Sequence, residues 1–263
     1  PTTPPSTSLK LCVEQLGRGK LSEGRPDFEN FRAHLLCDVE RCMFLAVSNY
    51  RRSLDLMVTS SAPWAHVTLY YGAFYAARAF LGMFGGLIDA PLALVEVVTD
   101  LPGNQELVVH RNVAKLLGHK HRLPSHRVFW EQFYDGCKSI LTYVDQNLDW
   151  AIQPISKDPY WPIDNRNRVN YDPYEALSLS LEFEKSFKER HFPSSLPGRM
   201  NTQYRLTEAL IQLALLQAHQ FCLNTDGLDM LGSGIPRESR IKKLIYDVTQ
   251  PKLEARANKF CFR

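Results

Sequence analysis

Residues 166–171, Arg-Asn-Arg-Val-Asn-Tyr, bring a guanidinium, an amide and a phenol into one short stretch. A guanidinium offsets negative charge on a phosphate, and an amide or a phenol adds hydrogen bonds to the same group. Tyrosine, whose ordinary pKa is about 10, is a poor general base near neutral pH, and asparagine does not titrate. Arg166, Asn167 and Tyr171 are therefore a candidate catalytic or phosphate-binding set. The structural alternative is that Arg166 and Asn167 hydrogen-bond the start of a helix near Asp172.

A second candidate is a basic stretch near the middle of the chain, because no Asp or Glu occurs between Leu107 and Trp130. A local excess of positive charge concentrates phosphate groups, and neighbouring aromatic rings stack on bases. The stretch predicts a nucleic-acid-binding surface, and the alternative is a solvated turn between helices. The predicted binding residues are Arg111, Lys115, His119, Lys120, His121, Arg122, His126 and Arg127.

The histidines of this stretch also suggest a metal site. His119 and His121 lie two positions apart, but no Cys, Asp or Glu close in sequence completes a tetrahedral ligand set. The six cysteines of the chain are dispersed without a C-x-x-C pair, which is typical of reduced, buried thiols. The fingerprints of a P-loop, a dinucleotide-binding fold and a Ser-His-Asp triad are lacking. We expect neither a metal nor a cofactor.

The helix that must position these groups is most strongly marked at residues 63–85. Ser60 and Ser61 supply capping side chains, and Pro63 suits the first helical turn. A pair of glycines at positions 85 and 86 marks the end. Apolar residues recur between these signals at three- and four-residue steps, the spacing of one helical face. Small residues at positions 72, 73, 76 and 77 would let a second helix approach closely.

Other stretches repeat the helical spacing. A long helix is predicted from Asp27 to about residue 57, pairing antiparallel with the helix at 63–85. Residues 87–103 are expected to form a loop with a short strand, and residues 154–173 an ordered loop rich in Pro and aromatic residues. The predicted fold class is all-α, an up-down helical bundle with an extra C-terminal helix. Further helices are predicted at residues 106–117, 128–148, 174–190, 202–222 and 238–247.

The chain is expected to have one central domain. Residues 1–26 would be a flexible leader and a short adaptor segment, residues 27–192 the bundle, and residues 193–263 a C-terminal helical extension packed on it. The predicted core follows from the apolar positions of the helices. It contains Phe31, Leu35, Leu45, Val67, Tyr71, Phe74, Leu81, Phe133, Ile140, Leu177, Leu181, Leu210 and Leu213.

The composition is that of a globular protein, with 44% hydrophobic and 22% charged residues. The net charge of +3 does not by itself require an anionic partner. The longest apolar runs, such as residues 211–218, fall far short of the roughly 20 residues that a membrane span needs. The first residues lack the basic and apolar regions of a secretory signal. We therefore expect a cytoplasmic protein without a membrane span.

Two segments carry a resemblance to a known family. Residues 70–79, Tyr-Tyr-Gly-Ala-Phe-Tyr-Ala-Ala-Arg-Ala, resemble the core helix of the HEPN superfamily, helical domains found in RNases, toxins and defence proteins. Tyr75 stands where that family usually has His. Residues 166–173 are similar to the segment that opens the last core helix of such domains. The resemblance covers roughly residues 27–190.

The resemblance implies an RNA-directed protein, with roles such as antiviral defence or a toxin–antitoxin system. In catalytic members an Arg and a His four to six residues later cleave RNA without metal, the His transferring a proton at the 2′-OH. Counted from Arg166, the expected His is replaced by Asn170 or Tyr171, so the implied catalytic motif is degenerate. The family also implies a homodimer. The alternative function is a non-catalytic helical module for dimerisation or for docking a partner protein, and whether the chain is an enzyme stays open.

Overall fold

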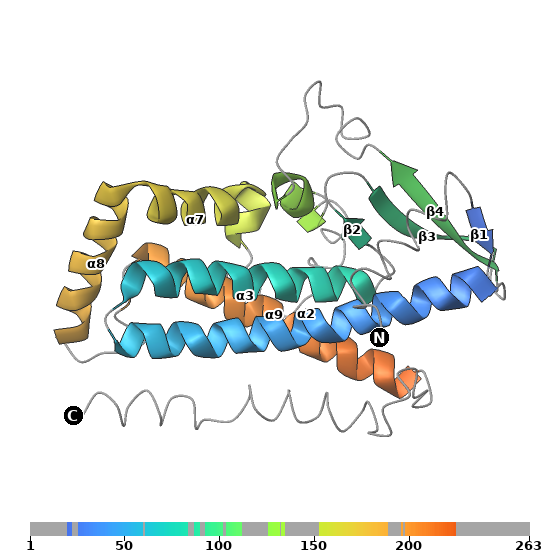
Figure 1. The fold of residues 1–263 in the computed structure, drawn as a ribbon, viewed down its shortest axis with the longest axis horizontal. Helices are drawn as coiled ribbons and strands as arrows, with labels where there is room; N and C mark the ends of the chain where they lie inside the picture. Colours follow the sequence, from blue (N-terminus) through green and yellow to red (C-terminus); the bar gives the residue numbers. More distant parts are fainter. Residues whose placement is uncertain are drawn as a thin grey trace, which may run out of the picture.

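The computed structural model describes the secondary structure of residues 20–22, 26–59, 61–83, 87–89, 93–101, 104–111, 126–131, 133–134, 153–188, 196 and 198–224. The predictions at residues 1–19, 135–148 and 238–247 lie outside this part of the chain. Two long helices, α2 (Pro26–Val58) and α3 (Ala62–Met83), run side by side as an antiparallel hairpin (Figure 1). The N–H of Ser61 donates to the carbonyl of Leu56 at 2.8 Å and closes the short turn between them. The two helices predicted at the start of the bundle are therefore present.

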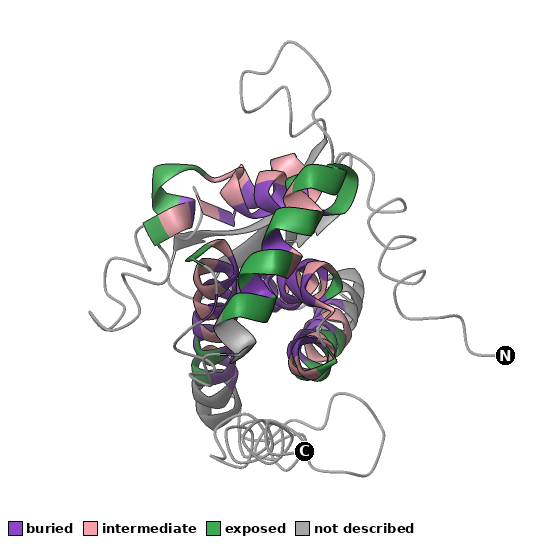
Figure 2. Cartoon of the chain, turned by 90° about the vertical axis from the view of Figure 1, so that its left-hand side faces the viewer, coloured by how far each residue is buried: buried purple, intermediate pink, exposed green. Residues whose placement is uncertain are grey.

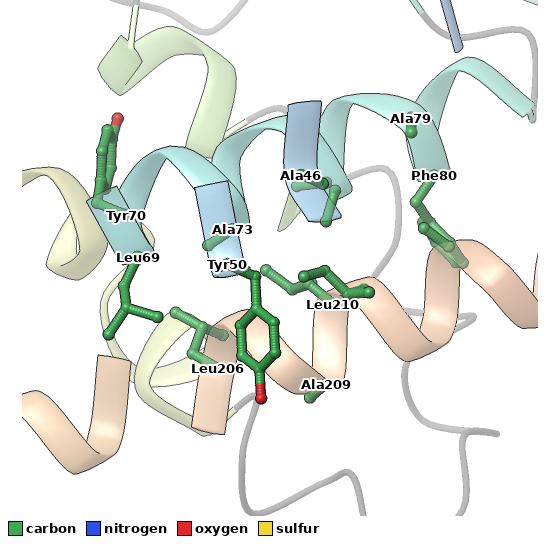
Figure 3. Packing of buried hydrophobic residues seen from close by; sticks show 14 of the residues in the cluster. Ala46, Tyr50, Leu69, Tyr70, Ala73, Ala79, Phe80, Leu206, Ala209 and Leu210 are labelled. Atoms are coloured by element: carbon green, nitrogen blue, oxygen red, sulfur yellow. The ribbon is translucent and has the colours of Figure 1, made fainter. Parts of the chain in front are cut away.

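Helix α9 (Gly198–Asn224) packs across α3 and completes a three-helix core (Figure 1). Gly72 lies where the three helices meet, since a Cβ at this position would lie 2.9 Å from Thr207 Cγ2 and 3.4 Å from the carbonyl oxygen of Ala46. A side chain at position 72 would therefore push α9 or α2 away. Figure 3 shows the apolar residues that fill this junction, with Leu69 of α3 facing Leu206 of α9. The Tyr50 and Tyr204 hydroxyls are 2.8 Å apart and join α2 to α9.

Helices α7 (Trp161–Tyr171) and α8 (Pro173–Lys188) pack along α3 and across one end of the bundle (Figure 1). The prediction of an ordered loop at residues 154–173 is wrong, because residues 153–157 and α7 are helical. Pro162 lies in the first turn of α7, where a missing N–H breaks no intrahelical hydrogen bond. Asp172 has an extended backbone between the two helices, and its Oδ1 accepts the N–H of Tyr174 at 2.9 Å.

A small antiparallel sheet lies at the opposite end, with the strand order β1-β4-β3-β2 (Figure 1). Its strands are β1 (Lys20–Ser22), β2 (Leu87–Asp89), β3 (Ala93–Leu101) and β4 (Asn104–Arg111). The predicted helix at residues 106–117 is wrong over its first part, where β4 pairs Leu107 with Val97 and Val109 with Val95. Neighbouring valines favour a pleated strand because their branched side chains are stiff. Beside this sheet, the bundle itself confirms the predicted all-α fold class.

The core agrees with the sequence prediction at most, but not all, positions. Leu35, Val67, Leu81, Phe133, Leu210 and Leu213 are buried, and Tyr71 and Phe74 are partly buried against the core. Leu45, Leu177 and Leu181 are exposed, so these three predictions are wrong. The side chains of Phe31 and Ile140 lie outside the described part. On α8 it is Leu179 and Phe183 that point into the bundle, and the helix is apolar on two faces.

Leu210 and Leu177 form a matched pair for testing this core. Leu210 is fully buried and Leu177 is 57% exposed. We expect Leu210→Ala to lower the free energy of unfolding by about 2–5 kcal/mol, because it removes packed methyl groups and leaves a cavity. Leu177→Ala should change it by no more than about 0.5 kcal/mol. Urea unfolding followed by circular dichroism measures both, and an equal loss in the two variants would contradict this packing.

Candidate functional site

The candidate site is built on two consecutive tyrosines of α3. Tyr70 is fully buried and Tyr71 is half-buried, and their rings lie 5.3 Å apart at nearly a right angle. A buried phenol requires a hydrogen-bond partner, because an unpaired hydroxyl in the interior is costly. Both hydroxyls find their partners on elements that are distant in sequence. The two tyrosines therefore act as the common support of the site.

Arg166 of α7 binds to Tyr71 and to its own neighbour. Its Nη2 donates to the Tyr71 hydroxyl at 2.6 Å, and its Nη1 donates to Asn167 Oδ1 at 2.7 Å. The guanidinium carbon lies 5.3 Å from the centre of the Tyr70 ring and 5.4 Å from that of Tyr71, within the range of a cation–π contact. These contacts fix the orientation of the guanidinium. Each Nη still carries a second N–H.

His126, in the helical residues 126–131, binds the other tyrosine of the pair, Tyr70. Its Nδ1 is 2.6 Å from the Tyr70 hydroxyl, and its ring stacks on Phe74 at 4.6 Å between centres. Trp130 Nε1 donates to the same hydroxyl at 3.3 Å. The phenol oxygen has two acceptor positions, so it can also accept a hydrogen bond from Nδ1–H, and in that tautomer Nε2 carries no proton. Nδ1 is thus occupied by Tyr70, and Nε2 is the nitrogen left for a substrate.

The electrostatics of the site favour a neutral imidazole beside a fixed cation. Burial lowers the pKa of His126 below its ordinary value of 6.5, and the positive charge of Arg166 lowers it further. Burial raises the pKa of Tyr70, so its hydroxyl stays protonated. The cluster Tyr70, Tyr71, His126 and Arg166, called here the Arg–His cluster, combines a positive charge with a nitrogen able to take a proton. Cleavage of a phosphodiester is one reaction that could use both functions.

The structure separates the predicted catalytic residues. Arg166 belongs to the Arg–His cluster and Asn167 accepts a hydrogen bond from it, whereas Tyr171 is 72% exposed at the end of α7. Five positions along a helix place two side chains about 140° apart around its axis, so Tyr171 points to another face. The imidazole beside Arg166 therefore comes from His126 and not from the segment that follows Arg166.

The predicted nucleic-acid-binding residues are described only in part. Arg111 is the last residue of β4, and Lys115, His119, Lys120, His121 and Arg122 lie outside the described residues. Arg127 Nη2 forms an ion pair with Asp164 Oδ1 at 2.7 Å, and its guanidinium lies 5.2 Å from the Tyr160 ring centre. The charge of Arg127 is thus balanced by an acid from α7. Of the described part of this stretch, His126 is the residue that joins the cluster.

Three of the residues that build the candidate site were not assigned to it from the sequence. Tyr71 was assigned to the core, Tyr70 to the helical motif alone and Trp130 to no site. The sequence does contain a signal for the two tyrosines, since two neighbouring positions of a core helix hold Tyr and not Phe. A buried phenol needs a polar partner, so these positions indicate a hydrogen-bonded site. The identity of that partner depends on tertiary contacts.

Within the described ranges, no group of three or more His, Cys, Asp or Glu residues is placed to hold a metal ion. The helices that were described include none with both the length and the apolar character needed to cross a membrane. No family model, no curated protein and no solved structure matches the chain.

The pKa of His126 tests the geometry of the cluster directly. We expect it to lie below 6.5, and Arg166→Gln to raise it, because the neutral side chain removes repulsion against the imidazolium. Since the folded protein then binds fewer protons at His126 than the unfolded chain, this residue's contribution to stability is complete above pH 6.5 and is lost as the pH falls below it.

Histidine ring resonances followed by NMR against pH give this pKa, with His126→Gln identifying the signal. Arg52→Gln, an exposed position on α2, is the matched control and should leave the titration unchanged. A pKa at or above 6.5, or one that Arg166→Gln does not move, would contradict the arrangement.

Proposed function

We propose that the chain is a HEPN-like, RNA-directed protein whose phosphodiester site is the Arg–His cluster. The observation that carries this proposal is the placement of Arg166 and His126 on adjacent tyrosines, each held by a 2.6 Å hydrogen bond. RNA is the substrate class because its 2′-OH supplies an internal nucleophile, which makes metal-free cleavage possible with one cation and one imidazole. A role in antiviral defence or in a toxin–antitoxin system rests on the family resemblance alone.

Arg166 is the phosphate ligand in this proposal. Its second Nη protons donate to the non-bridging oxygens, and its fixed orientation reduces the entropy lost on binding. Tyr71, which is half-buried, places an aromatic face beside the bound strand. The ion pair of Arg127 with Asp164 makes Arg127 a poor phosphate ligand, so Arg166 is the principal cation of the described site.

His126 transfers the proton. Nε2 takes the proton of the 2′-OH while the 2′-oxygen attacks the phosphorus, the P–O2′ bond forms and the P–O5′ bond breaks. The leaving 5′-oxygen takes a proton from water, and the products are a 2′,3′-cyclic phosphate and a 5′-hydroxyl end. Tyr70 holds the opposite ring nitrogen and is a positioning residue, as is Trp130, which binds the Tyr70 hydroxyl. His126 thereby takes the role that Tyr171 cannot fill.

Cleavage of single-stranded RNA in the presence of EDTA tests the proposal. His126→Asn should lower the cleavage rate about 100-fold or more with binding retained, because it removes the proton acceptor. Arg166→Gln should weaken both binding and cleavage, and the affinity of the wild type should fall with rising salt. Tyr171→Phe and Arg127→Gln are the matched controls and should behave as the wild type.

Cleavage that survives both His126→Asn and Arg166→Gln would place the chemistry elsewhere in the chain. Binding without cleavage in the wild type would reduce the proposal to RNA binding with a degenerate motif. RNA neither bound nor cleaved would leave the second function below.

The second candidate function is a non-catalytic module for dimerisation, and an apolar stripe on α8 favours it. Tyr174, Leu177 and Leu181 follow each other at steps of three and four residues and are 85%, 57% and 58% exposed. Figure 2 shows the exposed face of α8 across this end of the molecule. We propose that two copies of the chain join through this stripe, since an isologous contact pairs a surface with itself.

Light scattering at micromolar concentration tests the dimer. The wild type should have twice the mass of the chain, and Leu177→Ser with Leu181→Ser should give a monomer, because the substitutions remove the apolar contact area. Leu216→Ser, which changes an equally exposed leucine on α9, is the matched control and should leave the dimer intact. A monomeric wild type would contradict the proposal that two copies of the chain dimerise through α8.

A further inference from the structure

A pocket with a volume of about 480 Å³ lies beside α7, against the start of α9 and the helical residues 153–157. Helix α7 contributes Trp161, Asp164, Asn165 and Arg168, which share one face at the spacing i, i+3, i+4 and i+7. Arg166 does not line this pocket, which is therefore a different site from the Arg–His cluster. Its volume is that of a pocket for a small organic ligand.

The charges of the pocket favour an anion. Its two acids are already engaged, since Asp164 is paired with Arg127 and Asp158 Oδ1 accepts the N–H of Tyr160 at 2.9 Å. Lys157 and Arg168 also line the pocket, and neither forms an ion pair with any residue in the described part. Asp158 keeps its negative charge, so the side-chain charges of the lining that have no ion-pair partner in the described part are two positive and one negative, and their sum is positive.

The first turn of α9 adds backbone donors at the same place. Gly198, Arg199 and Thr202 line the pocket, and the first turn contains no acidic residue that would compensate the positive end of the helix dipole. The first N–H groups of a helix have no carbonyl partner within it, and phosphate is a ligand that satisfies them. Arg199 itself is paired with Glu175. The helix contributes the N–H groups of its first turn and its dipole.

Asn165 adds an independent observation, a buried polar group in the lining that has no partner among the described residues. Its side chain lines the pocket and is only 6% exposed, yet Nδ2 has no hydrogen-bond partner among the described residues. A buried amide without a partner loses its hydration with no compensation. An acceptor on a bound molecule would satisfy it. Trp161 adds a broad aromatic surface to the same lining.

We propose that this pocket binds a nucleotide. The phosphate lies among Lys157, Arg168 and the N-terminus of α9, the base lies along Trp161, and Asn165 donates to an acceptor of the base. The same chemistry is offered by a free nucleoside monophosphate and by the 5′-phosphorylated end of an RNA chain. This site goes beyond the proposed RNA chemistry and does not depend on Arg166 or His126.

Isothermal titration calorimetry of the full chain tests the proposal with AMP, GMP, CMP and UMP, a 5′-phosphorylated tetraribonucleotide, adenosine and inorganic phosphate. At least one monophosphate or the tetranucleotide should bind more tightly than adenosine and than phosphate alone. The variant with Lys157→Gln and Arg168→Gln should bind the preferred nucleotide about 10-fold more weakly or worse, because it loses charge-assisted hydrogen bonds. Both residues are exposed, so the fold should persist.

Asn165→Asp is a second variant with nearly unchanged volume, and it should also weaken binding because it replaces a donor with a negative charge. Lys185→Gln on α8 is the matched control and should bind as the wild type. The variants Arg166→Gln and His126→Asn should retain binding of the nucleoside monophosphates, which separates this site from the Arg–His cluster even if RNA cleavage is never observed.

The source of the nucleotide follows from the ranking of the probes. Tighter binding of a monophosphate supports a free nucleotide, and tighter binding of the tetranucleotide supports an RNA end. Adenosine binding as tightly as AMP would overturn the phosphate site, and inorganic phosphate binding as tightly as every nucleotide would overturn the base site. No binding by any probe, or equal binding by the Lys157 and Arg168 variant, would overturn the proposal as a whole.

Discussion

The close approach of three helices along α3 is the constraint on which the rest of the structure depends. At Gly72 a Cβ would meet Thr207 of α9 at 2.9 Å, and at Gly82 it would meet Val39 of α2 at 2.6 Å. Small residues between these points keep the backbones close and allow dense packing on two sides of α3. Because α2 and α9 occupy those sides, the large polar rings of α3 are left facing α7 and the helical residues 126–131.

The tyrosine pair of α3 forms the candidate site because its hydroxyls need hydrogen-bond partners. Burying two phenols beside the core is tolerated because each hydroxyl is hydrogen-bonded. The partners are Arg166 and His126, and their shared support places a fixed positive charge beside an imidazole in a partly desolvated environment. Burial lowers the pKa of His126, and the charge of Arg166 lowers it further, so both favour the neutral imidazole. The hydrogen bonds that join α7 and residues 126–131 to α3 are thus the same ones that arrange the Arg–His cluster.

Helix α7 separates two environments. Arg166 faces the tyrosines of α3, and Asn165 and Arg168 line the pocket beside the start of α9. Its short length and its Pro162 suit this position, since the first turn needs no donor at the proline. Asp172 then redirects the chain into α8, whose inner residues Leu179 and Phe183 join the core. Two chemically different surfaces therefore share one rigid element.

The sequence alone determined the elements whose signals are local. Helical spacing and terminal residues were enough to predict α2, α3 and α9, and the type of each residue marked Arg166, Asn167 and His126 as candidates. The tertiary structure decided which face of the doubly apolar α8 is buried, so Leu177 was predicted in the core and lies outside it. It also decided that the strand β4 pairs with β3 and that His126, not Tyr171, lies by Arg166. The physical reason is that periodicity reflects contacts within a few residues, whereas these outcomes depend on packing between segments far apart in the chain.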